Sequence, residues 1–236
     1  MGAIVAGTAP VKAESATAPL HVVELYTSQG CSACPPADKL LATYVERPDV
    51  LALTLPVDIW DYLGWRDTFA KRAYSERQRL YARKRGDGQV YTPQVVVNGT
   101  KHAIGHHKDA IDAAIKRTID TLAERRLRPV ITRDGNLVSV DARAHDGSDA
   151  SGEARVWLAQ IRDQSTVKIR RGENGGRRLS YHNVVERMMP VGTWRGTALR
   201  VALPEEPEAQ DRTFALIFQD GLAGPILGAA RVPDTD

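Results

Sequence analysis

Apolar runs of strand length alternate with amphipathic segments of helical period over residues 20–126. The apolar runs are residues 20–26, 50–55 and 95–97, followed by a short run at 101–104. The helical segments are residues 32–46, 68–84 and 108–126. An Asn-Gly pair at 98–99 is typical of a tight hairpin turn. The pattern predicts the order β-α-β-α-β-β-α, with the run at 50–55 buried in a parallel sheet.

Helical spacing also predicts which side chains of the second and third helices face the core. For the second helix these are Phe69, Ala73, Leu80 and Tyr81, with Arg72, Arg79 and Arg83 facing solvent. For the third helix they are Ile111, Ala114, Ile115, Ile119 and Leu122.

The pattern changes after residue 126, where strand-like runs are separated by Gly and Pro. These runs are residues 129–133, 137–141, 154–161, 199–203 and 213–218. An Asp-Gly-Asn sequence between the first two indicates a hairpin. We therefore predict an α/β domain over residues 20–126 and an antiparallel β-rich, sandwich-like domain over residues 127–236.

Composition narrows the function classes only slightly. Hydrophobic residues make up 42% of the chain and charged residues 26%, which suits a globular protein with a buried core. A formal net charge of +3 does not indicate a nucleic-acid partner. No apolar run reaches the length that spans a membrane. The oligomeric state is not predicted.

Residues 1–19 are rich in Ala, Gly, Thr and Pro and have little periodicity. One interpretation is the remnant of a secretory signal peptide, with an apolar stretch at residues 2–7 and a cleavage point near residue 13. The other is a disordered tail. We favour the first interpretation, and hence a periplasmic or secreted protein.

The two cysteines of the chain, Cys31 and Cys34, directly follow the first apolar run and open the first helix. Backbone N–H groups at a helix N-terminus carry partial positive charge and stabilise a thiolate, which is the nucleophile of disulfide exchange. The spacing therefore favours a dithiol redox site, in which Cys31 attacks and Cys34 resolves the mixed disulfide.

Two other interpretations of the cysteine pair stay open. A structural disulfide is possible, although closing so short a loop removes little unfolded-state entropy. Alternatively, the cysteines join His102, His106 and His107 in holding a soft metal such as Cu(I) or Zn(II). Exposed histidines after a hairpin need no such role, so we assign no metal ligands and no cofactor.

Several motifs together resemble a known bacterial family. They are VELYTSQGC from Val23, CPPAD from Cys34, WDYLGW from Trp60, YTPQ from Tyr91, RRGEN from Arg170 and YHNVV from Tyr181. This set is similar to a family of predicted secreted thioredoxin-like proteins, described as a domain of unknown function. The resemblance covers most of the chain after Leu20. It implies a thioredoxin-like fold for the N-terminal domain, but it brings no reaction or substrate with it.

The resemblance to thioredoxins implies roles for further residues. Pro93 matches a cis-proline that lies against the dithiol, and we add Thr92, Gly30 and Trp60 as candidate substrate-binding residues beside it. Glu24 matches the buried acid that serves proton transfer, with a one-residue adjustment of the alignment. The alternatives for that position are a strand-edge Glu that reaches solvent and a Glu paired with a basic side chain.

The chain also departs from ordinary thioredoxins around the cysteines. Ser32-Ala33 replaces Gly-Pro between them, Gly30 replaces Trp, and two prolines follow. Asp58 and Asp61, after the second strand, either lie near the dithiol or cap a turn.

We therefore expect a thiol–disulfide oxidoreductase acting on a disulfide- or thiol-bearing protein or a small thiol. The alternatives are a metal-binding or metal-delivery module that uses the dithiol, and a redox-sensing module in which the β-rich domain binds a partner.

Overall fold

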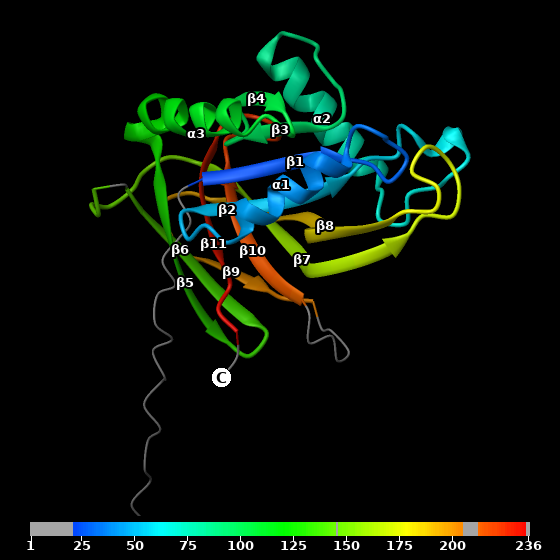
Figure 1. Ribbon diagram of the computed structural model, residues 1–236. Coiled ribbons are helices and arrows are strands. Elements are labelled where there is room, and N and C mark those ends of the chain that lie inside the picture. Colours follow the sequence, from blue (N-terminus) through cyan, green and yellow to red (C-terminus); the bar gives the residue numbers. More distant parts are fainter. Residues whose placement is uncertain (1–20, 145, 205–211, 235–236) are drawn as a thin grey trace, which may run out of the picture.

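The structure is a computed structural model that describes residues 21–144, 146–204 and 212–234 (Figure 1). The segment 1–19, interpreted above as a signal remnant or tail, lies outside the described residues. Within them, no helix combines the length and the apolar character needed to cross a bilayer.

The N-terminal half has the predicted order of strands and helices. Its elements are β1 (His21–Thr27), α1 (Pro35–Val45), β2 (Val50–Pro56), α2 (Arg72–Arg85), β3 (Gln94–Val97), β4 (Lys101–Ile104) and α3 (Lys108–Leu122). Short 3₁₀ turns lie at Asp61–Leu63 and Ala123–Arg125. Strands β1 and β2 are parallel, whereas β3 and β4 are antiparallel to their neighbours. The turn between β3 and β4 has positive φ at Asn98 and Gly99, as an Asn-Gly hairpin requires.

Side chains of β1 alternate between two cores because successive residues of a strand point to opposite faces. Val23 and Leu25 pack with residues of α1 and α3, while Val22 and Tyr26 pack with Tyr74 and Tyr81 of α2. The sheet is therefore covered by α1 and α3 on one face and by α2 on the other. This layering brings the turn between β1 and α1 to one edge of the sheet.

The C-terminal half consists of strands. They are β5 (Leu127–Asp134), β6 (Leu137–Ala144), β7 (Ala154–Lys168), β8 (Arg178–Trp194), β9 (Leu199–Ala202), β10 (Arg212–Gln219) and β11 (Ile226–Arg231). Two of these strands, β8 and β11, were not predicted from the sequence. Polar and charged residues interrupt strand β8, which also carries Pro190 and Gly192, so it lacks a simple apolar run.

One sheet runs through both halves of the chain. Its order is β11-β10-β7-β8-β2-β1-β3-β4, and β8 joins β2 in parallel at Val184 and Thr54. Strands β5, β6 and β9 form a second sheet. Side chains of both sheets share one core, among them Val140, Val156, Trp194 and Phe218. The predicted domain boundary at residue 126 falls between α3 and β5, and the large sheet is continuous across it.

Some of the predicted helix faces were wrong in detail. Helix α2 begins at Arg72, because the backbone of Lys71 is extended, with φ of −133° and ψ of 133°. Ala73 is exposed, whereas Arg77 is buried. In α3, Thr118 takes the buried place predicted for Ile119, because its hydroxyl accepts a hydrogen bond from Asn98.

A buried ion pair connects α2 to the middle of the sheet. The guanidinium of Arg77 donates to Glu24 Oε1 at 2.7 Å and to Gln219 of β10 at 3.1 Å. The hydroxyl of Tyr81 donates to Glu24 Oε2 at 2.7 Å. The Arg77 guanidinium also lies 4.9 Å from the centre of the Tyr81 ring. The charges of Glu24 and Arg77 are compensated by partners on β1, α2 and β10. Removing either charge would leave the other buried without its counter-charge.

We predict that Glu24→Gln lowers the free energy of unfolding by about 3–5 kcal/mol, because it leaves the Arg77 cation buried without its counter-charge. Denaturant unfolding measures the loss. The matched control is Glu76→Gln, which breaks the exposed pair with Arg72 and should cost under about 1 kcal/mol. Equal losses in the two variants would contradict the structural role of Glu24.

Candidate functional site

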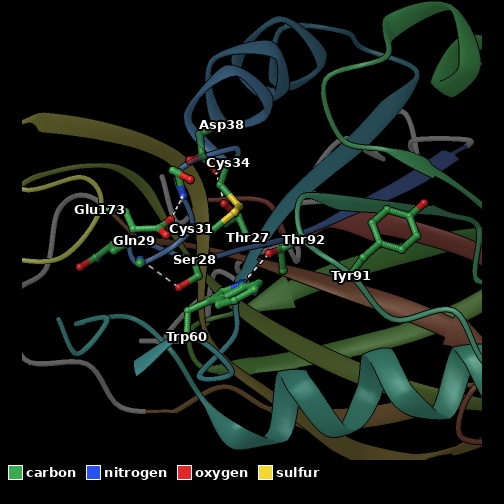
Figure 2. The surroundings of a disulfide bond; sticks show 12 residues. Thr27, Ser28, Gln29, Cys31, Cys34, Asp38, Trp60, Tyr91, Thr92 and Glu173 are labelled. Atoms are coloured by element: carbon green, nitrogen blue, oxygen red, sulfur yellow. Dashed lines mark hydrogen bonds between the residues drawn. A yellow bond between two sulfur atoms is a disulfide. The ribbon is translucent and has the colours of Figure 1, made fainter. Parts of the chain in front are cut away.

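Cys31 and Cys34 form a disulfide in the turn between β1 and α1, with their Cα atoms 5.4 Å apart (Figure 2). The turn is closed by hydrogen bonds from the Cys31 N–H to the Ser28 carbonyl and from the Cys34 N–H to the Cys31 carbonyl. Cys31 is 5% exposed and Cys34 is fully buried. Cys31 is therefore the more exposed of the two cysteines.

The start of α1 supplies fewer free N–H groups than the sequence suggested. The helix begins at Pro35 and Pro36, which have no N–H to donate. The next two N–H groups, of Ala37 and Asp38, both donate to the Cys34 carbonyl. The stabilisation of a thiolate at this site therefore comes from the helix dipole and from neighbouring charged side chains more than from free N–H groups of the first turn.

Asp38 is a buried acid beside the disulfide, and nothing in its sequence pattern assigned it a role. It lies one helical turn after Cys34, so the two residues share a helix face. Its Oδ1 accepts a hydrogen bond from Thr27 at 2.7 Å, and its Oδ2 is buried without a hydrogen-bond partner among the described residues. Burial raises the pKa of the Asp38 carboxyl to about 8; the Thr27 hydrogen bond opposes the rise and nearby Asp67 adds to it. Figure 2 shows the Asp38 carboxyl and the Thr27 hydroxyl next to the two sulfur atoms.

The tip of the long β7–β8 hairpin packs on the cysteine turn. Asn174, which is fully buried, donates from Nδ2 to the carbonyls of Gln29 at 3.0 Å and Cys31 at 2.9 Å. Glu173 accepts a hydrogen bond from the Ser32 N–H at 3.2 Å. These contacts fix the backbone of the turn from a segment far along the chain.

A loop after β2 supports the turn from another side. Gln29 accepts a hydrogen bond from the Trp65 ring N–H at 2.8 Å, and its backbone N–H donates to Asp67 at 2.7 Å. Burial raises the pKa of Asp67 to about 6, against hydrogen bonds from Gln29, Phe69 and Ala70 that lower it. The Asp67 N–H in turn binds the Asp61 carboxylate, so Asp61 holds this loop rather than contacting a cysteine. The Asp58 carboxylate accepts a hydrogen bond from the Ser75 hydroxyl of α2.

Three of the candidate substrate-binding residues lie together. Trp60 donates from its ring N–H to Thr92 Oγ1 at 2.7 Å, as Figure 2 shows, and its Cβ lies 3.0 Å from where a Cβ on Gly30 would stand. A larger residue at position 30 would therefore collide with Trp60. The Thr92–Pro93 peptide bond is cis. A Cβ added to Gly105 would stand 2.9 Å from Pro93 and from Ala37 of α1, which places Pro93 against the start of that helix.

The structure separates the remaining candidates from this group. The hydrogen bonds of Glu24 go to Arg77 and Tyr81, on the α2 side of the sheet. His102 contacts Tyr91 and Asp87, and the rings of His106 and His107 contact each other. Within the described ranges, no three His, Cys, Asp or Glu side chains are close enough to hold a metal ion.

The family model described as "Protein of unknown function (DUF1223)" matches residues 22–219. The chain belongs to the DUF1223 family. The match includes the cysteine turn, Asp38 and the hairpin tip with Asn174. No match was found among the curated proteins.

Two solved structures resemble this DUF1223 chain. One is the crystal structure of protein AGR_C_4864 from Agrobacterium tumefaciens, which is 31% identical with a TM-score of 0.76 and aligns over 93% of this chain and 97% of that one. The other, HBP35 of Porphyromonas gingivalis, is 12% identical with a TM-score of 0.57 over 92% of this chain and 76% of that one. The second likeness concerns the fold alone.

Three residues of the site were not among the candidates predicted from the sequence, although the sequence contains a signal for them. Asp38, Gln29 and Asn174 all lie within the motifs quoted for the resemblance, but none has a spacing that indicates contact with a cysteine. Asn174 is 143 residues from Cys31, so its contact depends on the β8 strand that was not predicted.

We predict that Asp38 makes the protein less stable as the pH rises. The folded state keeps a proton that the unfolded carboxyl, with a pKa of 3.8, has released, so unfolding becomes easier between about pH 4 and 8. The slope contributed by this group approaches about 1.4 kcal/mol per pH unit in that window. Asp38→Asn should remove the slope in denaturant unfolding at several pH values.

Asp120→Asn, an exposed change on α3, is the control and should leave the pH profile of unfolding unchanged. If the profiles of Asp38→Asn and the parent protein run parallel from pH 4 to 8, the carboxyl is not protonated in the folded state.

Proposed function

We propose that the protein is a thiol–disulfide oxidoreductase whose Cys31–Cys34 pair exchanges with a disulfide- or thiol-bearing protein or small thiol. The observation that carries the proposal is the disulfide itself, with Cys31 5% exposed and Cys34 fully buried. An asymmetric pair of this kind suits attack at Cys31 and departure or resolution at Cys34. A purely structural bridge has no need of an accessible sulfur.

We also propose that the domain of residues 20–126 is thioredoxin-like. Supporting this are the strand order β2-β1-β3-β4, the parallel pairing of β1 with β2, and the antiparallel pairing of β1 with β3. The cysteine pair follows β1, and the Thr92–Pro93 sequence precedes β3 at the same edge. The export of the protein remains our proposal from the composition of residues 1–19.

The reaction starts from the oxidised form. A substrate thiolate attacks Cys31 Sγ, the Cys31–Cys34 bond breaks, and Cys34 leaves as a thiolate that takes the proton of Asp38. A second substrate thiolate attacks the substrate sulfur of the mixed disulfide and expels Cys31 as a thiolate. The substrate has then lost two electrons and become a disulfide, and the protein holds them as a dithiol. The reverse sequence reduces a substrate disulfide.

Single-cysteine variants test the exchange. Reduced Cys34→Ser should attack a model peptide disulfide and remain in a mixed disulfide, because no second thiol resolves it. Cys31→Ser should form no such adduct at a comparable rate, since Cys34 is buried. Mass spectrometry of the intact protein measures the adduct.

The histidines provide the control. Replacing His102, His106 and His107 by Ala should leave adduct formation by Cys34→Ser unchanged. If the parent protein instead purifies with stoichiometric copper or zinc that this histidine variant loses, the metal-binding interpretation holds. If neither single-cysteine variant forms an adduct, the exchange function is wrong.

A further inference from the structure

Basic side chains gather on the hairpin that supports the cysteine turn. Residues 168–178 hold five Lys or Arg side chains and one acidic side chain, Glu173. Glu173 already accepts a hydrogen bond from Ser32. The exposed basic residues are Lys168, Arg170, Arg171, Arg177 and Arg178. Figure 1 shows this hairpin tip, in yellow, beside the blue turn that precedes α1.

The strand register sets two of these cations directly opposite each other. Lys168 of β7 pairs with Arg178 of β8, and like charges in opposite positions of an antiparallel ladder destabilise it. Neither residue forms an ion pair within the part of the chain that the structure describes. The two cations repel each other in this register, and a bound anion would reduce the repulsion.

The same face of the hairpin looks towards α1. A cavity of about 250 Å³ lies between them, lined on the α1 side by Pro35, Asp38 and Lys39 and on the β8 side by Arg178, Ser180 and His182. Pro35 directly follows Cys34. Lys39 is exposed, so cations stand on both sides of a hollow that begins at the cysteine turn.

We propose that this basic face, formed by Lys39, Lys168, Arg170 and Arg178, binds an acidic segment of the polypeptide whose disulfide or thiol exchanges with Cys31. The inference rests on the proposed exchange function and names its substrate class. A polypeptide fits better than a small anion, because the cations lie on different elements at two sides of the cavity, with Lys39 on α1 and Arg178 on β8. Cations spread in this way match several carboxylates of one chain.

Peptide disulfides of matched sequence test the proposal. Three peptides carry the same intramolecular disulfide flanked by four Glu, four Gln or four Lys residues. With the reduced protein at low salt, the Glu peptide should react on the order of tenfold faster than the Gln peptide, and added salt should remove the difference. The Lys peptide should be the slowest.

Charge reversal locates the effect on the protein. The variant Lys168→Glu/Arg178→Glu should lose the preference for the Glu peptide while the Gln peptide reacts as before. The matched control, Lys116→Glu/Arg117→Glu on the exposed face of α3, changes the net charge equally and should keep the preference. Thermal unfolding of both variants shows whether they are folded.

The remaining outcomes separate this inference from the proposed function. Equal rates for the Glu and Gln peptides, or equal effects of the two charge reversals, overturn the basic face as a substrate site. If glutathione disulfide reacts as fast as the Glu peptide and is equally sensitive to charge reversal, the ligand of the basic face is a small anion and not a polypeptide segment. If no disulfide reacts, exchange fails as the function. Fluorescence anisotropy of a labelled Glu peptide with its cysteines replaced by Ser then shows whether the face still binds acidic chain.

Discussion

Strand β2 lies between β1 and β8 in the sheet and is buried. The N–H and C=O groups on its β8 side therefore need hydrogen-bond partners inside the protein. Strand β8 supplies one of them through a side chain, since Asn183 Nδ2 donates to the Ala52 carbonyl at 2.9 Å. In return, Thr54 Oγ1 of β2 donates to the His182 carbonyl of β8 at 2.6 Å. Asn183 has a φ of 47°, a conformation that Asn tolerates better than most residues. This junction fixes the position of the whole β7–β8 hairpin, so the hairpin tip meets the cysteine turn.

The cysteine turn is therefore supported on several sides by side chains that fill its backbone hydrogen bonds. Asn174, on the hairpin, donates to two carbonyls of the turn, and Asp67, on the loop after β2, accepts from the Gln29 N–H. Trp60 fills the space beside Gly30. Asp38 is the exception, because one of its oxygens has no hydrogen-bond partner among the described residues. A turn fixed in this way is rigid in its backbone, and its chemistry is left to the sulfurs and to the one incompletely bonded acid.

The N-terminal elements and the cysteine turn could be predicted from the sequence, because each depends on local patterns: apolar runs, helical spacing and the Asn-Gly hairpin. Strand β8 could not, because polar and charged residues interrupt its apolar positions and its pairing with β2 depends on contacts between residues far apart in the sequence. The proton-transfer role expected for Glu24 remains a prediction, although its hydrogen bonds are to Arg77 and Tyr81. Asp38 was overlooked because burial, which gives this carboxyl its raised pKa, is a property of tertiary packing and leaves no mark on residue spacing.

The hydrogen bond between Asn174 and Cys31 has an evolutionary consequence. It joins residues 143 positions apart, across a strand that is itself needed to cover β2. A gene fragment ending near residue 126 would carry both cysteines and leave the carbonyls of Gln29 and Cys31 without their donor. Recombination that moved this fragment alone to another protein would separate the turn from its support. For this contact, selection acts on the side chain at position 174, because the Cys31 atom involved is a backbone carbonyl.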